Sequence, residues 1–294
     1  MNFKTAAELL ALCEEYQLPV SGVMKARECE ITEKTMQEIE ERMAVSLQIM
    51  KDAVREAIDH PQPSMGGLIG GESRKLADRY YEGKSITGHL VAKAVAYAMG
   101  VLEVTASMGL IVAAPTAGSA GVIPGVLLSL QEEYQFSDEK LIDALFHASA
   151  IGYLAMQNAT VAGAVGGCQA EIGVAAAMAA SAVVELMGGS PLQSTEAAST
   201  VLMNMLGLVC DPVGGLVEYP CQNRNAAGAA NALIAAEMSL SGIRQLIPLD
   251  EMMHIMYTVG RKLPPELRET AMGGCAVSPS ACAHCKSMKR EEKA

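Results

Sequence analysis

The sequence predicts an all-α fold, a compact bundle of helices rich in Ala and Gly. Half of its 294 residues are hydrophobic, yet only 4% are aromatic and Trp is absent, so Ala, Met, Val, Ile and Leu dominate, beside 27 Gly. Apolar residues recur at helical spacing, and no run of alternating β-branched residues indicates a strand. The length suits one large domain, and we expect a single helical catalytic domain over residues 1–294.

The first helices are indicated by capping signals and periodicity. The Thr-Ala-Ala-Glu sequence that begins at Thr5 is a capping box, and it predicts a helix that ends before Pro19. A long amphipathic helix is expected from Thr32, because apolar residues recur at steps of three and four until Pro61. The glycine-rich residues 64–71 that follow predict a loop.

The remaining helices are separated by Gly, Pro or Asn. We expect them at residues 89–100, 137–156, 169–187, 194–207, 226–241 and 249–260. The polar end of the chain, from about residue 286, is expected to be a flexible tail.

Charge and hydropathy narrow the classes of function. A net charge of −11 argues against a nucleic-acid partner, because counterion release requires a basic surface. Residues 104–130 and 144–170 are long and almost uncharged, so a helical membrane component is one hypothesis. However, Pro115 and Pro124 would break a lipid-exposed helix, which favours a buried core and no membrane. No apolar signal-peptide core follows Met1, so we expect a cytoplasmic protein.

Three cysteines occupy settings that suit a metal site. Cys168 and Cys221 each precede a predicted helix, and Cys210 begins a turn. A helix N-terminus favours the thiolate, so three such thiols could hold a metal or a negatively charged cluster. Each one alone could equally be an ordinary buried cysteine, and the spacing does not decide between these readings.

A second group of cysteines lies near the C-terminus. Cys282 and Cys285 flank His284 and resemble half of a zinc site, with Cys275 upstream. No second pair lies at a suitable distance, so a zinc-holding interaction module and loose tail thiols are both open.

Small and polar residues mark a possible substrate site. Residues 114–121 contain small side chains and two hydroxyls, so their backbone N–H groups could cradle a carboxylate, or the segment could be a tight turn. The segment lacks the Lys of a phosphate loop, which argues against a nucleotide.

Arg224 and Glu171 are isolated charges in apolar surroundings, where each is either paired or functional. No Lys occurs between Lys140 and Lys262, which argues against a pyridoxal-phosphate enzyme.

Together these motifs resemble the iron–sulfur L-serine dehydratases. The resemblance rests on residues 103–126, the Gly-Gly-Cys-Gln-Ala-Glu run around Cys168, residues 210–225 and the Pro-Pro-Glu-Leu-Arg-Glu-Thr run from Pro264. It covers nearly the whole chain. It implies a helical catalytic domain and a lyase that converts L-serine to pyruvate and ammonia. It also implies a [4Fe–4S] cluster held by Cys168, Cys210 and Cys221.

The resemblance is to the isolated alpha subunit, which implies a separate beta (regulatory) subunit as partner. One departure from the family pattern is Cys275, where family members often have Leu. Some members end on a Cys that can occupy the fourth iron, whereas here Cys285 lies nine residues before the end. Cys285 is therefore a possible fourth, inhibitory ligand.

The implied chemistry needs an open iron as Lewis acid for the hydroxyl and a base for the α-hydrogen. Four candidates for the base stay open: Glu171, His147, His89 and His60. For substrate binding the candidates are Thr116, Gly118 and Ser119 at the carboxylate, with Asn223 and Arg224 near the cluster. A related cluster-dependent lyase, such as an L-cysteine desulfidase, is the nearest alternative.

Overall fold

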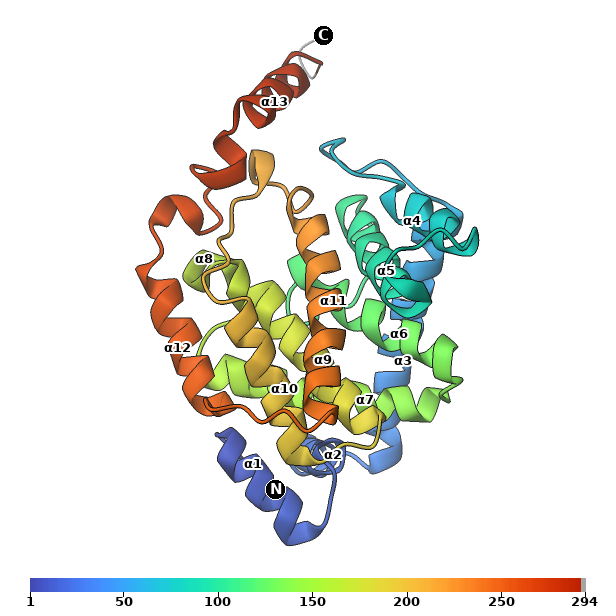
Figure 1. The fold of residues 1–294 in the computed structure, drawn as a ribbon, viewed down its shortest axis with the longest axis vertical. Helices are drawn as coiled ribbons and strands as arrows, with labels where there is room; N and C mark the ends of the chain where they lie inside the picture. The colour runs from blue at the N-terminus through green and yellow to red at the C-terminus, as the bar shows by residue number, and fades with distance from the viewer. Residues whose placement is uncertain (292–294) are drawn as a thin grey trace.

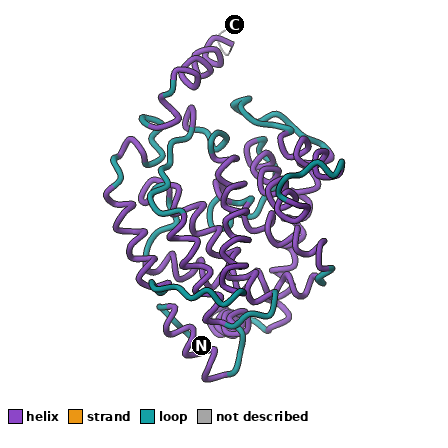
Figure 2. The backbone as a smooth tube through the Cα atoms, viewed as in Figure 1, coloured by secondary structure: helices purple, strands orange, loops and turns teal. Residues whose placement is uncertain are grey.

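Helices and connecting loops make up the described chain, and the all-α prediction is confirmed (Figures 1 and 2). The computed structural model describes residues 1–291, and side chains through Cys285. Within this part, the one β-type pairing is an isolated parallel bridge between Cys210 and Arg268. The helices are α1 Ala6–Tyr16, α2 Val20–Thr32, α3 Met36–Asp59, α4 Glu72–Tyr81, α5 Gly88–Ala106, α6 Val122–Tyr134, α7 Asp138–Asn158, α8 Gly163–Gly166, α9 Val174–Leu186, α10 Pro191–Asn204, α11 Cys221–Leu240, α12 Leu249–Lys262 and α13 Pro279–Glu291. Short helical turns are η1 Ala117–Ser119, η2 Gln169–Gly173, η3 Val213–Gly215, η4 Pro265–Leu267 and η5 Gly274–Val277.

Helix α9 lies at the centre of the fold. Every residue from Val174 to Val184 is buried. A helix that is apolar on all sides must be covered on all sides, and α6, α7, α10 and α11 pack around it. The site described below lies at the N-terminal end of this central helix.

Small residues allow neighbouring helices to approach closely, as the composition indicates. A Cβ added at Gly121 would lie 2.0 Å from the Ala98 carbonyl oxygen, and one at Gly125 would lie 2.7 Å from that of Ala94. No other residue type fits at these two positions between α5 and α6 without moving a helix. The close approach at Gly121 brings the end of the loop that precedes α6 against α5.

Most of the helices expected from the sequence are present, and the expected start of the long amphipathic helix is wrong. Thr32 ends α2, and α3 begins at Met36, where Thr35 and Glu38 form a capping box. Thr5 caps α1 by accepting the N–H of Glu8, as expected. Helix α2 lacks a side-chain cap, which explains why its start carries no sequence signal.

The two long apolar stretches are not continuous helices. Residues 104–130 contain the end of α5, a loop, η1 and α6, in which Pro124 stands in the first turn, where its missing N–H is tolerated. Two other helical runs in the described chain are long and apolar enough to cross a membrane, Gly88–Ala106 and Gln169–Leu186, and they are 67% and 83% buried. Such burial is typical of core helices in a folded domain.

Helix α13 projects from the end of the molecule opposite α1 and the N-terminus (Figure 1). The tail predicted from about residue 286 is helical as far as Glu291, and residues 292–294 lie outside the described residues.

Candidate metal centre

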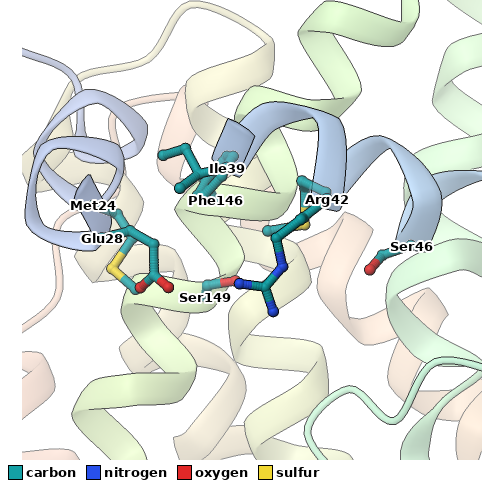
Figure 3. Close-up of a pocket in the computed structure, with 8 residues that line it drawn as sticks. Met24, Glu28, Ile39, Arg42, Ser46, Phe146 and Ser149 are labelled. Carbon is teal, nitrogen blue, oxygen red and sulfur yellow. The ribbon is translucent and has the colours of Figure 1, made fainter. Parts of the chain in front are cut away.

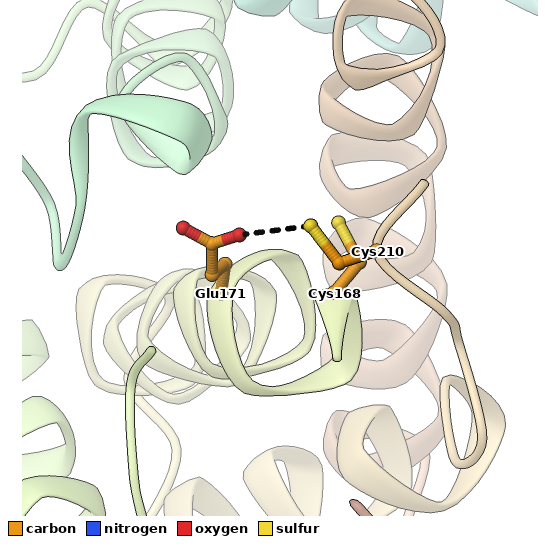
Figure 4. Close-up of side chains that lie close together, drawn as sticks. All are labelled: Cys168, Glu171 and Cys210. Carbon is orange, nitrogen blue, oxygen red and sulfur yellow. Dashed lines mark hydrogen bonds between the residues drawn. The ribbon is translucent and has the colours of Figure 1, made fainter. Parts of the chain in front are cut away.

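Two of the cysteines predicted to bind a metal and one of the carboxylates predicted as a base lie together at the start of the central helix (Figure 4). Cys168 precedes η2, which contains Glu171 and continues into α9. Cys210 is brought beside them by its bridge to Arg268: its N–H donates to Leu267 and its carbonyl accepts from Glu269. The ligand atoms of Cys168, Glu171 and Cys210 all lie within 4.8 Å of one another.

The two cysteines of the group are buried, and Glu171 is partly buried beside them. Cys168 and Cys210 are 2% and 3% exposed, and the Cys210 Sγ lies 3.8 Å from Glu171 Oε2. The hydrogen bond with Cys168 and burial raise the pKa of Cys210, and burial, followed by the charge of Glu269, raises that of Glu171. Thiolate sulfur and carboxylate oxygen are common metal-ligand atoms, and a bound cation would favour the ionised form of both, so the donor set fits a metal centre.

Cys221 lies at the first position of α11 but outside the tight group. Burial raises its pKa to about 12, with further contributions from the charges of Cys168 and Glu171. The third predicted cysteine is therefore within electrostatic range of Cys168 and Glu171.

Residues 114–121, predicted to cradle a substrate carboxylate and here named the carboxylate loop, lie against Glu171. Thr116 Oγ1 donates to Glu171 Oε1 at 2.9 Å, and a Cβ at Gly118 would lie 3.3 Å from the same oxygen. Ser119 is fully buried, and its hydroxyl lies 3.1 Å from Thr116 Oγ1. The loop thus fixes the carboxylate of Glu171 through Thr116 and keeps Ser119 inside the turn.

The three residues of the Asn-Arg-Asn run in α11 differ in their exposure and contacts. Asn223 is exposed, and the described contacts do not link it to the cysteines. Arg224 donates to the Val209 carbonyl at 2.8 Å and pairs with Asp211 at 2.7 Å, so it holds the segment that carries Cys210. Asn225 was not among the predicted site residues.

Asn225 is fully buried and joins two segments of the site, the start of α11 and the loop before α6. Its side-chain amide donates to the carbonyls of Gly118 and Cys221 at 2.8 and 2.9 Å, and its oxygen accepts the N–H of Gly121 at 3.1 Å. A buried amide with three partners fixes the position of the carboxylate loop relative to Cys221.

The three histidine candidates for the base lie elsewhere. His147 is fully buried and bonded at 2.7 Å to both Glu185 and Ser181. Glu185 lies about 20 Å along the helix from Glu171, at 1.5 Å per residue. His60, at the end of α3, and His89, in the first turn of α5, are exposed. Of the four candidates, Glu171 is the one that the structure brings to the cysteines.

Known proteins similar to this chain match it over most of its length. The family model described as serine dehydratase alpha chain matches residues 15–276. The chain belongs to this family. It is 48% identical over 278 residues to the probable L-serine dehydratase alpha chain of Bacillus subtilis, covering 95% of this chain and 92% of that one. It is 40% identical over 274 residues to the L-serine dehydratase alpha chain of Peptoniphilus asaccharolyticus, covering 93% and 94%. The L-serine dehydratase TdcG of Escherichia coli is 36% identical over 282 residues, which cover 94% of this chain and 62% of that longer protein.

In this member of the serine dehydratase alpha chain family, sequence reasoning missed several residues that shape the site. A Cβ at Gly163 would lie 2.5 Å from Glu171 Oε2 and 3.1 Å from the Cys210 sulfur. Glu218 accepts bonds from Ser64 Oγ and from the N–H groups of Gly66 and Leu68, so it ties the glycine-rich loop to the Cys221 segment. The sequence contains one signal for this role, because Glu218 is the one charged residue between Asp211 and Cys221.

Cys275 and Cys285 lie beside the chain segment that runs from Cys210 to Cys221, but outside the tight group. The N–H of Cys275 donates to Asp211 at 2.6 Å, and Cys282 is exposed. A Cβ at Gly214, in η3, would lie 3.5 Å from the Cys285 sulfur. Helix α13 therefore places Cys285 against the turn between Cys210 and Cys221.

Proposed function

We propose that the chain is the catalytic alpha subunit of an L-serine dehydratase, a lyase that converts L-serine to pyruvate and ammonia. The observation that carries the proposal is the group formed by two buried thiols, Cys168 and Cys210, and the partly buried Glu171 at the start of α9. It occurs in a chain that matches proteins named L-serine dehydratase alpha chain over most of their length. We further propose that residues 1–294 form one catalytic domain and that the enzyme is cytoplasmic.

The proposed cofactor is a [4Fe–4S] cluster held by Cys168, Cys210 and Cys221. The fit rests on the donor set, in which two buried thiols and a partly buried carboxylate lie together. When bound, a cluster with three cysteine ligands supplies a Lewis-acidic iron with one coordination position open to the substrate.

The side chains of the site have distinct proposed roles. Glu171 takes the α-hydrogen of L-serine as a proton, and Thr116 orients it through the 2.9 Å hydrogen bond. The substrate carboxylate is placed near Thr116, Gly118 and Ser119, beside the Glu171 side chain. Loss of the hydroxyl as water leaves aminoacrylate, which hydrolyses to pyruvate and ammonia.

The remaining predicted residues are proposed to support this arrangement rather than contact the substrate. Arg224 holds the Cys210 segment through Val209 and Asp211. Asn223 is exposed, and the buried Asn225 is the asparagine that contacts the loop.

We propose that a beta subunit completes the enzyme. The names of the B. subtilis and P. asaccharolyticus relatives refer to an alpha chain, and the E. coli relative is a longer protein of which this chain covers 62%. The isolated chain is expected to turn over L-serine slowly until the beta subunit is added. High turnover by the purified chain alone would contradict this part of the proposal.

The proposal is tested by purifying the chain anaerobically with its beta subunit and measuring iron, acid-labile sulfide and pyruvate formation. We expect a brown protein that forms pyruvate from L-serine and loses both colour and activity in air. Colourless protein with no iron would refute the cofactor. Faster release of sulfide from L-cysteine than of pyruvate from L-serine would favour the desulfidase alternative.

A further inference from the structure

Two adjoining hollows lie on the side of the molecule formed by α2, α3 and α7, and the proposed reaction does not use them. The first, of about 300 Å³, is shown in Figure 3. The second, of about 380 Å³, shares Met43, Ser46 and Ser149 with the first and extends to Pro115. Both are within the size range of small-molecule sites.

The first hollow presents one cation and one anion without protein partners. Figure 3 shows the Glu28 carboxylate, from α2, and the Arg42 guanidinium, from α3, on either side of Ser149. Among the described residues, neither charged group forms an ion pair or a side-chain hydrogen bond. The neighbouring Lys25, by contrast, is engaged by both Glu40 and Asp143 at 2.5 Å.

The floor of the hollows is apolar. Met24, Ile39 and Phe146 are the large apolar side chains, besides Met43, that line the first hollow. The second is lined mainly by apolar side chains, among them Met50, Val112, Ile123, Leu145 and Met178. A ligand with two unlike charges at one end and a hydrocarbon chain at the other matches this order of groups.

We propose that the two hollows bind a free α-amino acid with an apolar side chain. Arg42 would bind the carboxylate of the amino acid through bidentate, charge-assisted hydrogen bonds, and Glu28 would accept a hydrogen bond from its ammonium group. The hydrocarbon side chain would enter the second hollow. A dicarboxylate would be repelled by Glu28 and a diamine by Arg42, so the two charges select a zwitterion.

The second hollow connects this site with the carboxylate loop. Its wall includes Ala114 and Pro115, which directly precede Thr116. An occupied hollow therefore packs against the segment that positions Thr116 and, through it, Glu171. L-serine is too short and polar to fill the second hollow, so this site is distinct from the one proposed for the substrate.

The test is isothermal titration calorimetry of the full chain with L-leucine and L-methionine. We expect saturable binding of both, and binding at least about tenfold weaker for 4-methylpentanoate and for 3-methylbutylamine, each of which lacks one charge. Arg42→Gln and Glu28→Gln should each weaken binding by at least about tenfold, since each removes a charged hydrogen bond. Arg55→Gln is the matched control, because Arg55 lies on the same helix outside both hollows.

Three results would overturn the proposal. One is the absence of saturable heat up to about 10 mM, well above ordinary metabolite affinities. Another is unchanged binding in folded Arg42→Gln and Glu28→Gln proteins, with folding checked by thermal unfolding. The third is displacement of L-leucine by L-serine, which would place the ligand in the candidate active site. Because heat is measured and not pyruvate, the result stands whether or not the chain proves to be a serine dehydratase.

Discussion

Gly163 offers a direct test of the proposed role of Glu171, because the added methyl group of Gly163→Ala would enter the site itself. The new Cβ would lie 2.5 Å from Glu171 Oε2 and 3.1 Å from the Cys210 sulfur. The carboxylate must retreat by roughly 1 Å to regain van der Waals separation. A displacement of that size in a reacting group lowers activity by about 100-fold. The alanine itself favours helix α8 by about 0.5–1 kcal/mol, which offsets part of the about 1–3 kcal/mol of overpacking, so the protein should still fold.

Gly173→Ala is the matched control for this variant. Gly173 ends the same helical turn as Glu171, but its added Cβ would meet only Met205 at 3.6 Å and, at 3.9 Å, Gln169 and Leu202. Pyruvate formation from L-serine should fall about 100-fold in Gly163→Ala and change less than about threefold in Gly173→Ala. Thermal unfolding shows whether both proteins are folded. Equal activity of two folded variants would refute the proposed placement of Glu171 in the reaction.

Three further predictions concern the carboxylate, the buried amide and the tail. Glu171→Gln should retain iron but lower pyruvate formation by about 100-fold to 10,000-fold; loss of iron would instead indicate that Glu171 is a ligand. Asn225→Ala should lower the free energy of unfolding in urea by roughly 2–4 kcal/mol, because three buried or partly buried partners lose their bonds, whereas Asn223→Ala on the exposed face should have almost no effect. Truncation after Pro279 removes Cys285 and should shorten any activation lag with L-serine and increase oxygen sensitivity. If lag and air stability are both unchanged, the tail thiol does not reach the cluster.

The helices were predictable where local signals and burial agree. The buried run of α9 follows from its uninterrupted small and apolar residues, and the capped start of α1 follows from Thr5. The start of α3 was misplaced because Thr32 and Thr35 both precede the periodic pattern. Thr35 alone has Glu38 three residues later, the spacing that forms the capping box in the structure.

The assembly of the site was only partly predictable. Cys168 and Glu171 are three residues apart at one helix entry, so their proximity follows from local structure. Cys210 joins them through a bridge to Arg268, which is a long-range pairing that no local pattern encodes. His147 could not be assigned from the sequence either, since its partners Ser181 and Glu185 lie on another helix.

Iron and sulfide analysis of single Cys→Ser variants tests the central claim most directly. Anaerobically purified protein is expected to contain about four iron and four sulfide per chain. Cys168→Ser, Cys210→Ser and Cys221→Ser should each lose most of both, while Cys13→Ser, a change at a buried thiol of α1, should keep them. A full iron and sulfide complement in any of the first three variants would contradict the proposed ligand set.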